Sequence, residues 1–183
     1  MGQPKALMEI AGKTFVRRVV DILLEGGCSQ VIVIVPYDPD IQNEAHNTDA
    51  TILVNPNPGE GPITSLRLAL QQLSSKVEGI IYLPVDHPLV QADTISKLIR
   101  IATESGSPLG IPTYLGDRGH PSFFRSSLFN ELNDPELEGG ARTVVHRHLA
   151  DATLIPVNDP GVTADIDTLE SYESALEQFS ESL

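Results

Sequence analysis

The sequence predicts an α/β protein with three layers, in which a mostly parallel sheet carries helices on both faces. Apolar, β-prone runs at 31–35, 51–54 and 79–85 alternate with amphipathic helical segments, which is the signature of this architecture. The run at 79–85 shows no polar alternation, as expected for a strand buried on both faces. A chain of 183 residues fits one domain, so we expect residues 1–183 to fold as a single unit.

Local signals define the elements of the first half of the chain. Thr14 is a suitable N-cap for a helix that continues to about Glu25, where two glycines end it. A short helix is expected within 38–47, before the strand at 51–54. Pro62 suits the first position of the next helix, whose apolar residues recur at helical spacing.

The second half continues with a helix at 92–103 and less regular elements after it. Short strands are expected at 109–112 and 122–124, a short helix at 126–132, a helix at 141–149 and a strand at 152–157. A last helix follows residue 168. Asp167 with Glu170 three positions later resembles a capping pair at its start.

Composition limits the classes of partner. The chain has 12 basic and 25 acidic residues and a net charge of −13, which argues against a nucleic-acid binder. No apolar run approaches the roughly 18 residues of a membrane span, so no membrane partner is expected. The single Cys28 cannot form an internal disulfide, which favours a cytoplasmic location. The oligomeric state is left open.

Three acidic residues are candidate metal ligands. Asp86 ends the run at 79–85, and ligands of open α/β sheets bind at the carboxyl ends of strands. A carboxylate there suits Mg²⁺, although Asp86 could also only cap a turn before Pro88. Asp165 and Asp167 are two positions apart and point the same way in an extended segment. Either could join Asp86 on one ion, or both could cap the last helix.

Further candidates are a lysine, a helix start and a polar loop. Lys5 is either a solvated terminal lysine or a phosphate ligand. Gly61 leaves the backbone N–H groups of the following helix open to a phosphate or a nucleobase, and Thr64 and Ser65 add hydroxyls. Arg118 and His120 lie in a loop shaped by glycines and a proline. Cations, open helix starts and scattered carboxylates fit phosphoryl or nucleotidyl transfer.

An ordered set of motifs resembles one family. The motifs are Met-Gly-Gln-Pro-Lys at 1–5, Glu-Gly-Pro-Ile-Thr-Ser-Leu-Arg at 60–67, Val-Asp-His-Pro-Leu-Val at 85–90, Gly-Asp-Arg-Gly-His-Pro at 116–121, Gly-Gly-Ala-Arg at 139–142 and Asp-Ile-Asp-Thr at 165–168. In order and spacing they are similar to nucleotidyltransferases with a Rossmann-like, GT-A-like fold. The group that they resemble most is the molybdenum cofactor cytidylyltransferase-like proteins.

The resemblance implies a role for each candidate. Lys5 would contact the nucleotide phosphates and act with Asp86 in catalysis, and Mg²⁺ would bind Asp86 together with Asp165 or Asp167. The base would be read by residues of the helix start, namely Gly61, Pro62, Thr64 and Ser65. The acceptor, a phosphate-bearing pterin such as molybdopterin, would bind Arg118, Gly119 and His120. Its phosphate would attack the α-phosphate of a nucleoside triphosphate, with CTP favoured, and release pyrophosphate.

The chain departs from the family pattern at its beginning. The family opens with a strand and a Gly-rich phosphate loop that come before the Met-Gly-x-Pro-Lys segment, whereas this sequence starts at Met1. We expect the absent strand to belong between 31–35 and 79–85, Met1 to be internal to a longer natural chain, and this form to transfer nucleotides weakly. The alternatives are a sugar-phosphate nucleotidyltransferase and a non-catalytic nucleotide-binding or regulatory domain.

Overall fold

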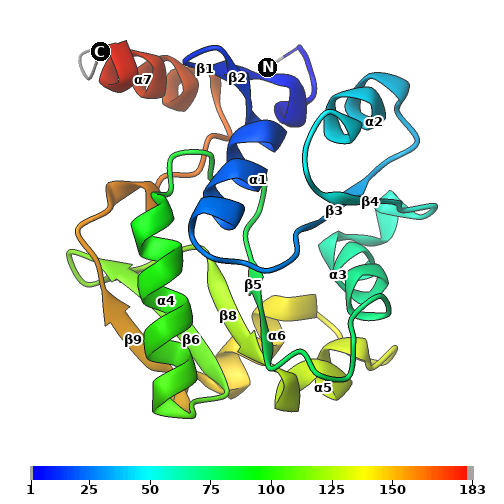
Figure 1. The fold of residues 1–183 in the computed structure, drawn as a ribbon, viewed down its shortest axis with the longest axis vertical. Helices are drawn as coiled ribbons and strands as arrows, with labels where there is room; N and C mark the ends of the chain where they lie inside the picture. The colour runs from blue at the N-terminus through cyan, green and yellow to red at the C-terminus, as the bar shows by residue number, and fades with distance from the viewer. Residues whose placement is uncertain (1, 181–183) are drawn as a thin grey trace.

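The computed structural model describes residues 2–180, so the expectation about Met1 lies outside the described residues. Helices cover both faces of a central sheet, and the α/β class is confirmed (Figure 1). The strands are β1 (Glu9–Ile10), β2 (Lys13–Thr14), β3 (Ile32–Val35), β4 (Thr51–Val54), β5 (Gly79–Tyr82), β6 (Leu109–Tyr114), β7 (Asp117–Arg118), β8 (Ser122–Arg125) and β9 (Thr153–Pro156).

Seven α-helices and five 3₁₀ turns connect these strands in the described residues. The helices are α1 (Phe15–Glu25), α2 (Pro39–His46), α3 (Pro62–Leu70), α4 (Ala92–Ser105), α5 (Phe129–Asn133), α6 (Gly140–Arg147) and α7 (Leu169–Ser180). The 3₁₀ turns are η1 (Lys5–Leu7), η2 (Pro58–Glu60), η3 (Ser126–Leu128), η4 (Leu149–Asp151) and η5 (Pro160–Val162). The caps follow the local signals: the Thr14 hydroxyl accepts from the backbone N–H of Arg17, and Pro62 opens α3.

The described strands form three sheets, and the largest of them is mixed. The main sheet has the order β5-β8-β6-β7, and β9 pairs in parallel with β6. Strand β8 runs antiparallel to both β5 and β6. Strands β3 and β4 form a separate parallel pair, with Ile32 opposite Thr51. Strand β6 is therefore hydrogen-bonded on both sides, whereas β3 pairs only with β4 and β5 only with β8 in the described chain.

The predicted strand at 79–85 ends earlier than its apolar run. Strand β5 stops at Tyr82, and Leu83 to Asp86 form a loop beyond it. Pro84 has no backbone N–H to give to a ladder, and its carbonyl accepts a turn hydrogen bond from the backbone N–H of His87 at 3.2 Å. Asp86 thus lies beyond the carboxyl end of the strand, in a loop rather than at its last residue.

Within residues 2–180, no ladder joins β3 to β5. The family's additional strand was expected to belong between these two strands. The two strands are nevertheless held in one body. Buried residues of α1, among them Val19 and Val20, form a cluster against which Val33 of β3 and Ile81 of β5 both pack. Helix α1 therefore spans the break on one face of the sheet, as Figure 1 shows.

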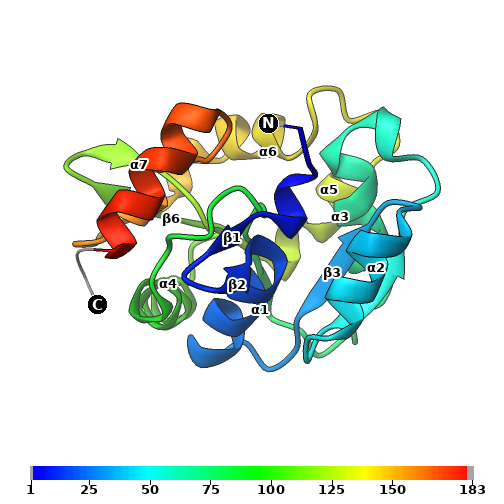
Figure 2. The ribbon, with the colours of Figure 1, turned by 90° about the horizontal axis from the view of Figure 1, so that it is seen from above.

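The two faces of the main sheet have separate cores. Phe123 and Phe124 are neighbours on β8, so their side chains point to opposite faces. Phe123 packs with Leu98 and Ala102 of α4, whereas Phe124 packs in the cluster formed with α3, α5 and α6. Viewed from above, α1 and α4 lie on one side and α3, α5 and α6 on the other (Figure 2). This second side carries the cavity described below.

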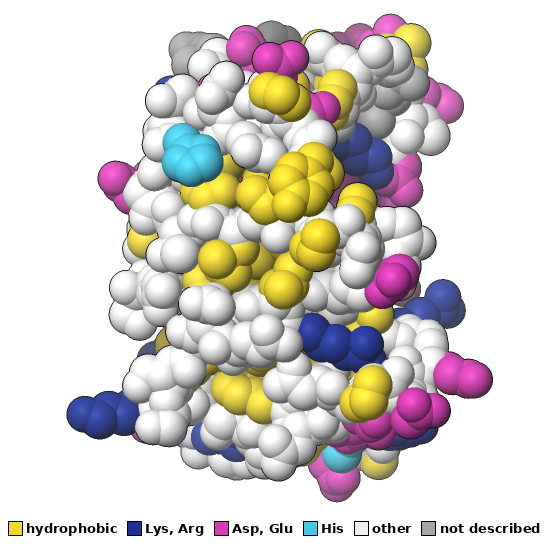
Figure 3. Space-filling view, turned by 90° about the vertical axis from the view of Figure 1, so that its right-hand side faces the viewer, with side chains coloured by type: hydrophobic (Ala, Val, Ile, Leu, Met, Phe, Trp, Pro, Cys, Tyr) yellow, Lys and Arg dark blue, Asp and Glu magenta, His cyan; other side chains and the backbone are white. Residues whose placement is uncertain are grey.

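The face at the right-hand side of Figure 1 is less completely covered. Apolar side chains gather across its middle in the space-filling view (Figure 3). Strand β4, which pairs only with β3, has Ile52, Leu53 and Val54 half-buried rather than buried. Across residues 2–180, no helix is both long enough and apolar enough to cross a membrane.

Candidate active site

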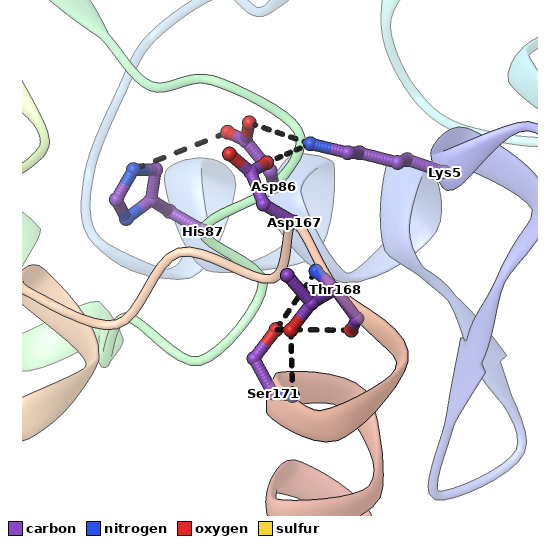
Figure 4. Close-up of polar contacts among 6 residues, drawn as sticks. All are labelled: Lys5, Asp86, His87, Asp167, Thr168 and Ser171. Atoms are coloured by element: carbon purple, nitrogen blue, oxygen red, sulfur yellow. Dashed lines mark hydrogen bonds and ion pairs between the residues drawn. The ribbon is translucent and has the colours of Figure 1, made fainter. Parts of the chain in front are cut away.

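Three charged side chains from distant segments meet beyond the carboxyl end of β5. Lys5 comes from η1, Asp86 from the loop after β5 and Asp167 from the segment before α7. The Lys5 ammonium lies 3.2 Å from Oδ2 of Asp86 and also forms an ion pair with Oδ1 of Asp167 (Figure 4). One lysine thus joins two carboxylates that lie 81 and 162 positions from it in the sequence.

The charges of this cluster shift one another's pKa values. Partial burial alone would lower the pKa of Lys5, but hydrogen bonds and attraction from Asp167 and Asp86 raise it above its ordinary value. The hydrogen bond from Lys5 lowers the pKa of Asp167. The Oδ1 atom of Asp86 is buried without a hydrogen-bond partner in the described residues. This carboxylate therefore keeps acceptor capacity that the protein itself does not fill.

The start of α7 explains why Asp167 is available to Lys5. The expected capping pair of Asp167 and Glu170 is wrong. Instead the Thr168 hydroxyl accepts from the backbone N–H of Ser171, and the Ser171 hydroxyl accepts from the backbone N–H of Thr168, each at 3.1 Å (Figure 4). Because Thr168 and Ser171 satisfy these N–H groups, the Asp167 carboxylate points to Lys5 and Asp86.

The segment 165–167 is fixed to the loop of Asp86 through its backbone. Ile166, which is buried between the two acids, donates its N–H to the carbonyl of Asp86 at 2.8 Å. Asp165 and Asp167 are both exposed on either side of it. Asp167 shares Lys5 with Asp86, whereas Asp165 lines a separate small hollow beside α7. The geometry therefore distinguishes two acids that the sequence left equivalent.

Two histidines connect the carboxylate cluster to the loop at 116–121. The rings of His87 and His120 lie with centroids 4.6 Å apart. Burial, followed by the neighbouring His87, lowers the pKa of His120 to about 4, and burial also lowers the pKa of His87. Both imidazoles are therefore neutral at pH 7. Tyr82 also meets the ring of His120, in an edge-to-face contact with the centroids 6.3 Å apart.

Backbone contacts fix the position of the loop that carries Arg118, Gly119 and His120. The His120 N–H donates to the carbonyl of Val162 at 2.7 Å, and the Gly119 N–H donates to that of Pro112 at 3.0 Å. A Cβ atom on Gly119 would lie 1.9 Å from the Val162 carbonyl oxygen. Only glycine fits this approach, so Gly119 serves the packing of the loop, while Arg118 projects from it with an exposed side chain.

A buried aspartate, which the sequence analysis missed, ties together the two segments that supply Asp86 and Asp167. Asp159 is 2% exposed, and its Oδ2 accepts from the Gln91 N–H at 2.9 Å and from the Thr94 hydroxyl at 2.7 Å. Its Oδ1 accepts from the Gly161 N–H at 2.9 Å. Asp159 thus caps the start of α4 and the η5 turn at once. No local pattern announced the contacts with α4, because Thr94 and Gln91 lie 65 and 68 positions away from Asp159.

At the helix start at 61–65, the hydroxyls that were expected to help read the base are hydrogen-bonded within the protein. Asn55, also missed, is 3% exposed and donates its Nδ2 hydrogens to the hydroxyls of Thr64 at 2.9 Å and Ser65 at 3.0 Å. The Thr64 hydroxyl donates in turn to the Gly61 carbonyl. The structure therefore uses these two hydroxyls to hold the loop in place. The sequence signal for this role was the position of Asn55, directly after a strand and before a Pro-rich loop.

A large cavity lies between the helix start and the histidine loop. Its volume is about 1090 Å³, and it is lined by Gly61 and Pro62 at one side, by residues 116–120 at another and by the first two turns of α6. Its floor is apolar and includes Leu66, Ile111 and Phe124. Since small-molecule pockets occupy roughly 300–1000 Å³, this volume has room for a nucleoside and an acceptor side by side. His120 links the cavity wall to the carboxylate cluster.

The acidic residues suit a divalent metal ion that takes only part of its ligands from the protein. Among residues 2–180, no group of three or more His, Cys, Asp or Glu side chains is arranged as a metal site. Asp86 and Asp167 converge on one point, and the buried Oδ1 of Asp86, which lies 3.9 Å from Nε2 of His87, has no hydrogen-bond partner in the described residues. Mg²⁺ characteristically takes one or two carboxylates and completes its shell with water and substrate phosphates. Two acids and an open side match that requirement.

The fold and the cluster of one lysine and two carboxylates beside a cavity define a nucleotide-using transferase. The sequence matches the MobA-like NTP transferase domain over residues 1–152, and the chain belongs to this family. The expected family and fold class are therefore confirmed, and the family supports a role as a transferase.

Relatives cover almost the whole chain. Nicotine blue oxidoreductase of Paenarthrobacter nicotinovorans is 25% identical over 180 residues, which cover 94% of this chain and 88% of that protein. The crystal structure of Rv0371c from Mycobacterium tuberculosis H37Rv superimposes with a TM-score of 0.82 at 26% identity, covering 97% of this chain and 90% of the other. A complex of Rv0371c with manganese gives a TM-score of 0.80 at 25% identity over 95% and 91% of the two chains.

Proposed function

We propose that this protein is a divalent-metal-dependent nucleotidyltransferase that joins the nucleoside monophosphate of an NTP to a phosphate-bearing small molecule. The observation that supports this most directly is the convergence of Lys5, Asp86 and Asp167 at the edge of a cavity large enough for two ligands. Phosphoryl-type transfer depends mainly on positioning and on neutralising charge, and this cluster offers both.

Asp86 and Asp167 are the residues that would hold Mg²⁺, with Asp165 as the alternative partner of Asp86. The bound ion would neutralise negative charge on the triphosphate and orient it. Lys5 is a cation that balances the two carboxylates. With the nucleotide in place, its flexible ammonium is within the same site as the phosphates and can donate hydrogen bonds to them.

The reaction forms one bond at phosphorus and breaks another. An oxygen of the acceptor phosphate attacks the α-phosphorus of the NTP, and the bond from that phosphorus to the bridging α–β oxygen breaks. The leaving group is pyrophosphate, which carries away the electron pair of the broken bond. The chain contributes by holding both reactants and by supplying cationic groups where negative charge builds up.

The nucleotide and the acceptor are proposed on the basis of the family resemblance. CTP is the favoured nucleotide, and molybdopterin is the favoured acceptor. Gly61 and Pro62 line the cavity and are placed to contact the base, while Thr64 and Ser65 support them through Asn55. Arg118 and His120 line the same cavity and are placed to contact the acceptor. A sugar-phosphate acceptor is the alternative within the same chemistry.

A second candidate function is oxidation or reduction of a small molecule. The observation in its favour is the 25% identity with a protein named as an oxidoreductase over 94% of this chain. Hydride transfer of this kind commonly uses NADH or NADPH. The two functions predict different ligands for one cavity, so a ligand panel separates them.

The test is a thermal-shift panel of CTP, GTP, ATP, UTP and NADPH, each with and without Mg²⁺. A ligand that binds only the folded state at 100 times its Kd stabilises it by about 2.7 kcal/mol, which gives a clear rise in Tm. We expect CTP to raise the Tm in a manner that depends on Mg²⁺. A shift with NADPH alone, indifferent to Mg²⁺, would favour the oxidoreductase and refute the transferase.

A further inference from the structure

A buried histidine lies directly beside the carboxylate of Asp86. His87 is 7% exposed, and its Nε2 lies 3.9 Å from Oδ1 of Asp86 (Figure 4). That Oδ1 atom is buried without a hydrogen-bond partner in the described residues, and the same holds for Nδ1 of His87. Buried polar atoms without partners are rare in folded proteins, so two of them on adjacent residues call for a physical explanation.

The two oxygens of Asp86 face different surroundings. Oδ2 lies 3.2 Å from the Lys5 ammonium, which also pairs with Asp167. Oδ1 lies on the side of His87, and the two contacts leave the carboxylate in different directions (Figure 4). A carboxylate that is held at one oxygen cannot rotate freely about its own bond. A group that holds Oδ1 would therefore keep Oδ2 turned towards Lys5 and Asp167.

The surroundings of the His87 ring decide which nitrogen carries the proton. Burial lowers the pKa of His87, so the ring is neutral at pH 7 and has one N–H group. Attraction from nearby aspartates, Asp86 first, and a hydrogen bond with the Gly161 backbone oppose this shift. A proton on Nδ1 would leave a buried donor unpaired and turn the lone pair of Nε2 towards a negative oxygen. A proton on Nε2 avoids both costs.

Neighbouring segments hold the imidazole in this place. The backbone N–H of His87 donates to the Pro84 carbonyl at 3.2 Å, and the ring packs against that of His120, with the centroids 4.6 Å apart. His120 is itself fixed, because its backbone N–H donates to the Val162 carbonyl at 2.7 Å. A ring that is buried and packed in this way keeps one edge towards Asp86, which suits a residue that orients a neighbour.

We propose that His87 is a positioning residue for metal binding, whose Nε2–H group is directed at Oδ1 of Asp86 and keeps Oδ2 turned towards Lys5 and Asp167. The distance of 3.9 Å is longer than a hydrogen bond, but the attraction between an N–H dipole and a full negative charge acts over it. The inference rests on the proposed metal-dependent transfer, because it adds a supporting residue to the same carboxylate. Part of the metal affinity then depends on a side chain that is not itself a ligand.

The test uses the different reach of two amides. The side-chain NH₂ of glutamine comes close to the position of Nε2 in histidine, whereas that of asparagine comes close to the position of Nδ1. Mn²⁺ binding in the presence of CTP is measured by electron paramagnetic resonance for the wild type, His87→Gln, His87→Asn and His87→Met. Urea unfolding reports the stability of each variant. His46→Gln, which replaces an exposed histidine at the end of α2, is the control.

We expect His87→Asn and His87→Met to lose about 10- to 100-fold in Mn²⁺ affinity, the usual effect of removing a residue that orients a metal ligand. His87→Gln should stay close to the wild type, because it restores a donor at the position of Nε2, and His46→Gln should change nothing. Equal affinities in all variants would overturn the role. So would losses that follow the order of the unfolding free energies instead of the presence of that donor.

A second measurement needs neither a variant nor a metal. The NMR chemical shifts of the ring nitrogens distinguish the two neutral tautomers, and we expect His87 of the wild type to carry its proton on Nε2 at pH 7. A proton on Nδ1 would overturn the inference. If the wild type binds no Mn²⁺ with CTP, the proposed transfer fails and this role fails with it. Normal binding by the wild type and by His87→Met refutes the role alone.

Discussion

Lys5 shows how one residue can organise an acidic site. Its ammonium holds Asp86 and Asp167 together, although the like charges of these acids would otherwise repel each other. The same ammonium competes with a divalent ion for the two carboxylates. Lysine therefore both shapes the acidic pair and limits how tightly free metal binds to it.

Replacing Lys5 by Ala is expected to have opposite effects on metal and nucleotide. Without the competing cation, Mn²⁺ alone should bind more tightly, on the order of tenfold, because one unit charge within a few ångströms is removed. Binding of CTP with the metal should weaken. Both affinities can be measured by calorimetry, with Lys13→Ala as control, since Lys13 pairs with Asp21 elsewhere. Weaker Mn²⁺ binding by Lys5→Ala would contradict this account.

The neutral histidine pair predicts a pH dependence of stability. The pKa of His120 is lowered to about 4 in the folded state, whereas an unfolded histidine titrates near 6.5. Between these values the unfolded chain binds a proton that the folded chain does not, so stability falls as pH falls from 6.5 towards 4. The loss reaches about 3 kcal/mol from His120 near pH 4.

Urea unfolding at pH values from 7 to 4 measures this loss. In His120→Gln the decline should be visibly shallower than in the wild type. His146→Gln, which replaces an exposed histidine, should keep the wild-type slope. Parallel curves for the wild type and His120→Gln would show that His120 is not held neutral in the fold.

At the level of elements, the segments that carry the acids are held by a buried carboxylate. Asp159 accepts three hydrogen bonds and so fixes the start of α4 to the η5 turn. Replacing it by Ala leaves those donors buried without partners. We expect a loss of about 3 kcal/mol in the free energy of unfolding, and weaker Mn²⁺ binding because Asp167 loses its support.

Asp151→Ala is the matched control for Asp159→Ala, since Asp151 is exposed in η4. It should change the unfolding free energy by less than about 0.5 kcal/mol. Chemical denaturation of both variants, together with a Mn²⁺ titration, gives the comparison. If Asp159→Ala unfolds like the control, the proposed coupling between the two segments is wrong.

Local sequence signals predicted the helices and strands well, but they could not predict contacts between distant residues. The strand at 51–54, the Thr14 cap and the Pro62 helix start follow from neighbouring residues and are found as expected. The apolar run at 79–85 did not indicate where β5 ends, because Pro84 cannot donate a backbone hydrogen bond to a neighbouring strand but is itself apolar. Asn55 and Asp159 act through tertiary hydrogen bonds, which no periodicity reveals.

The site itself was predicted in parts. Lys5, Asp86 and the acids at 165 and 167 were named from motifs, and the structure brings Lys5, Asp86 and Asp167 together. The pairing of Lys5 with Asp167 depends on the capping of α7 by Thr168 and Ser171, which is a matter of geometry.

At the scale of the whole molecule, the interrupted sheet predicts an uneven distribution of stability. Strand β6 is paired on both sides, whereas β3 and β5 each have one unpaired edge in the described residues. Amide hydrogen exchange should therefore be slowest in β6. The amides of β3 and β5 that point to the unpaired edges should exchange faster, because fewer hydrogen bonds must break to expose them to water. Uniform protection across these three strands would show that the break between β3 and β5 is closed in solution.

The central claim, that Asp86 and Asp167 form a metal site for a nucleotide, is tested most directly by Mn²⁺ binding measured by electron paramagnetic resonance. Titrations with and without CTP are made on the wild type, Asp86→Asn, Asp167→Asn and Asp165→Asn. We predict that CTP tightens Mn²⁺ binding to the wild type. Asp86→Asn and Asp167→Asn should each weaken Mn²⁺ binding in the presence of CTP by at least tenfold, which corresponds to about 1.4 kcal/mol. Asp165→Asn should lose far less. Binding that survives both Asp86→Asn and Asp167→Asn, or that depends on Asp165 alone, would contradict the account.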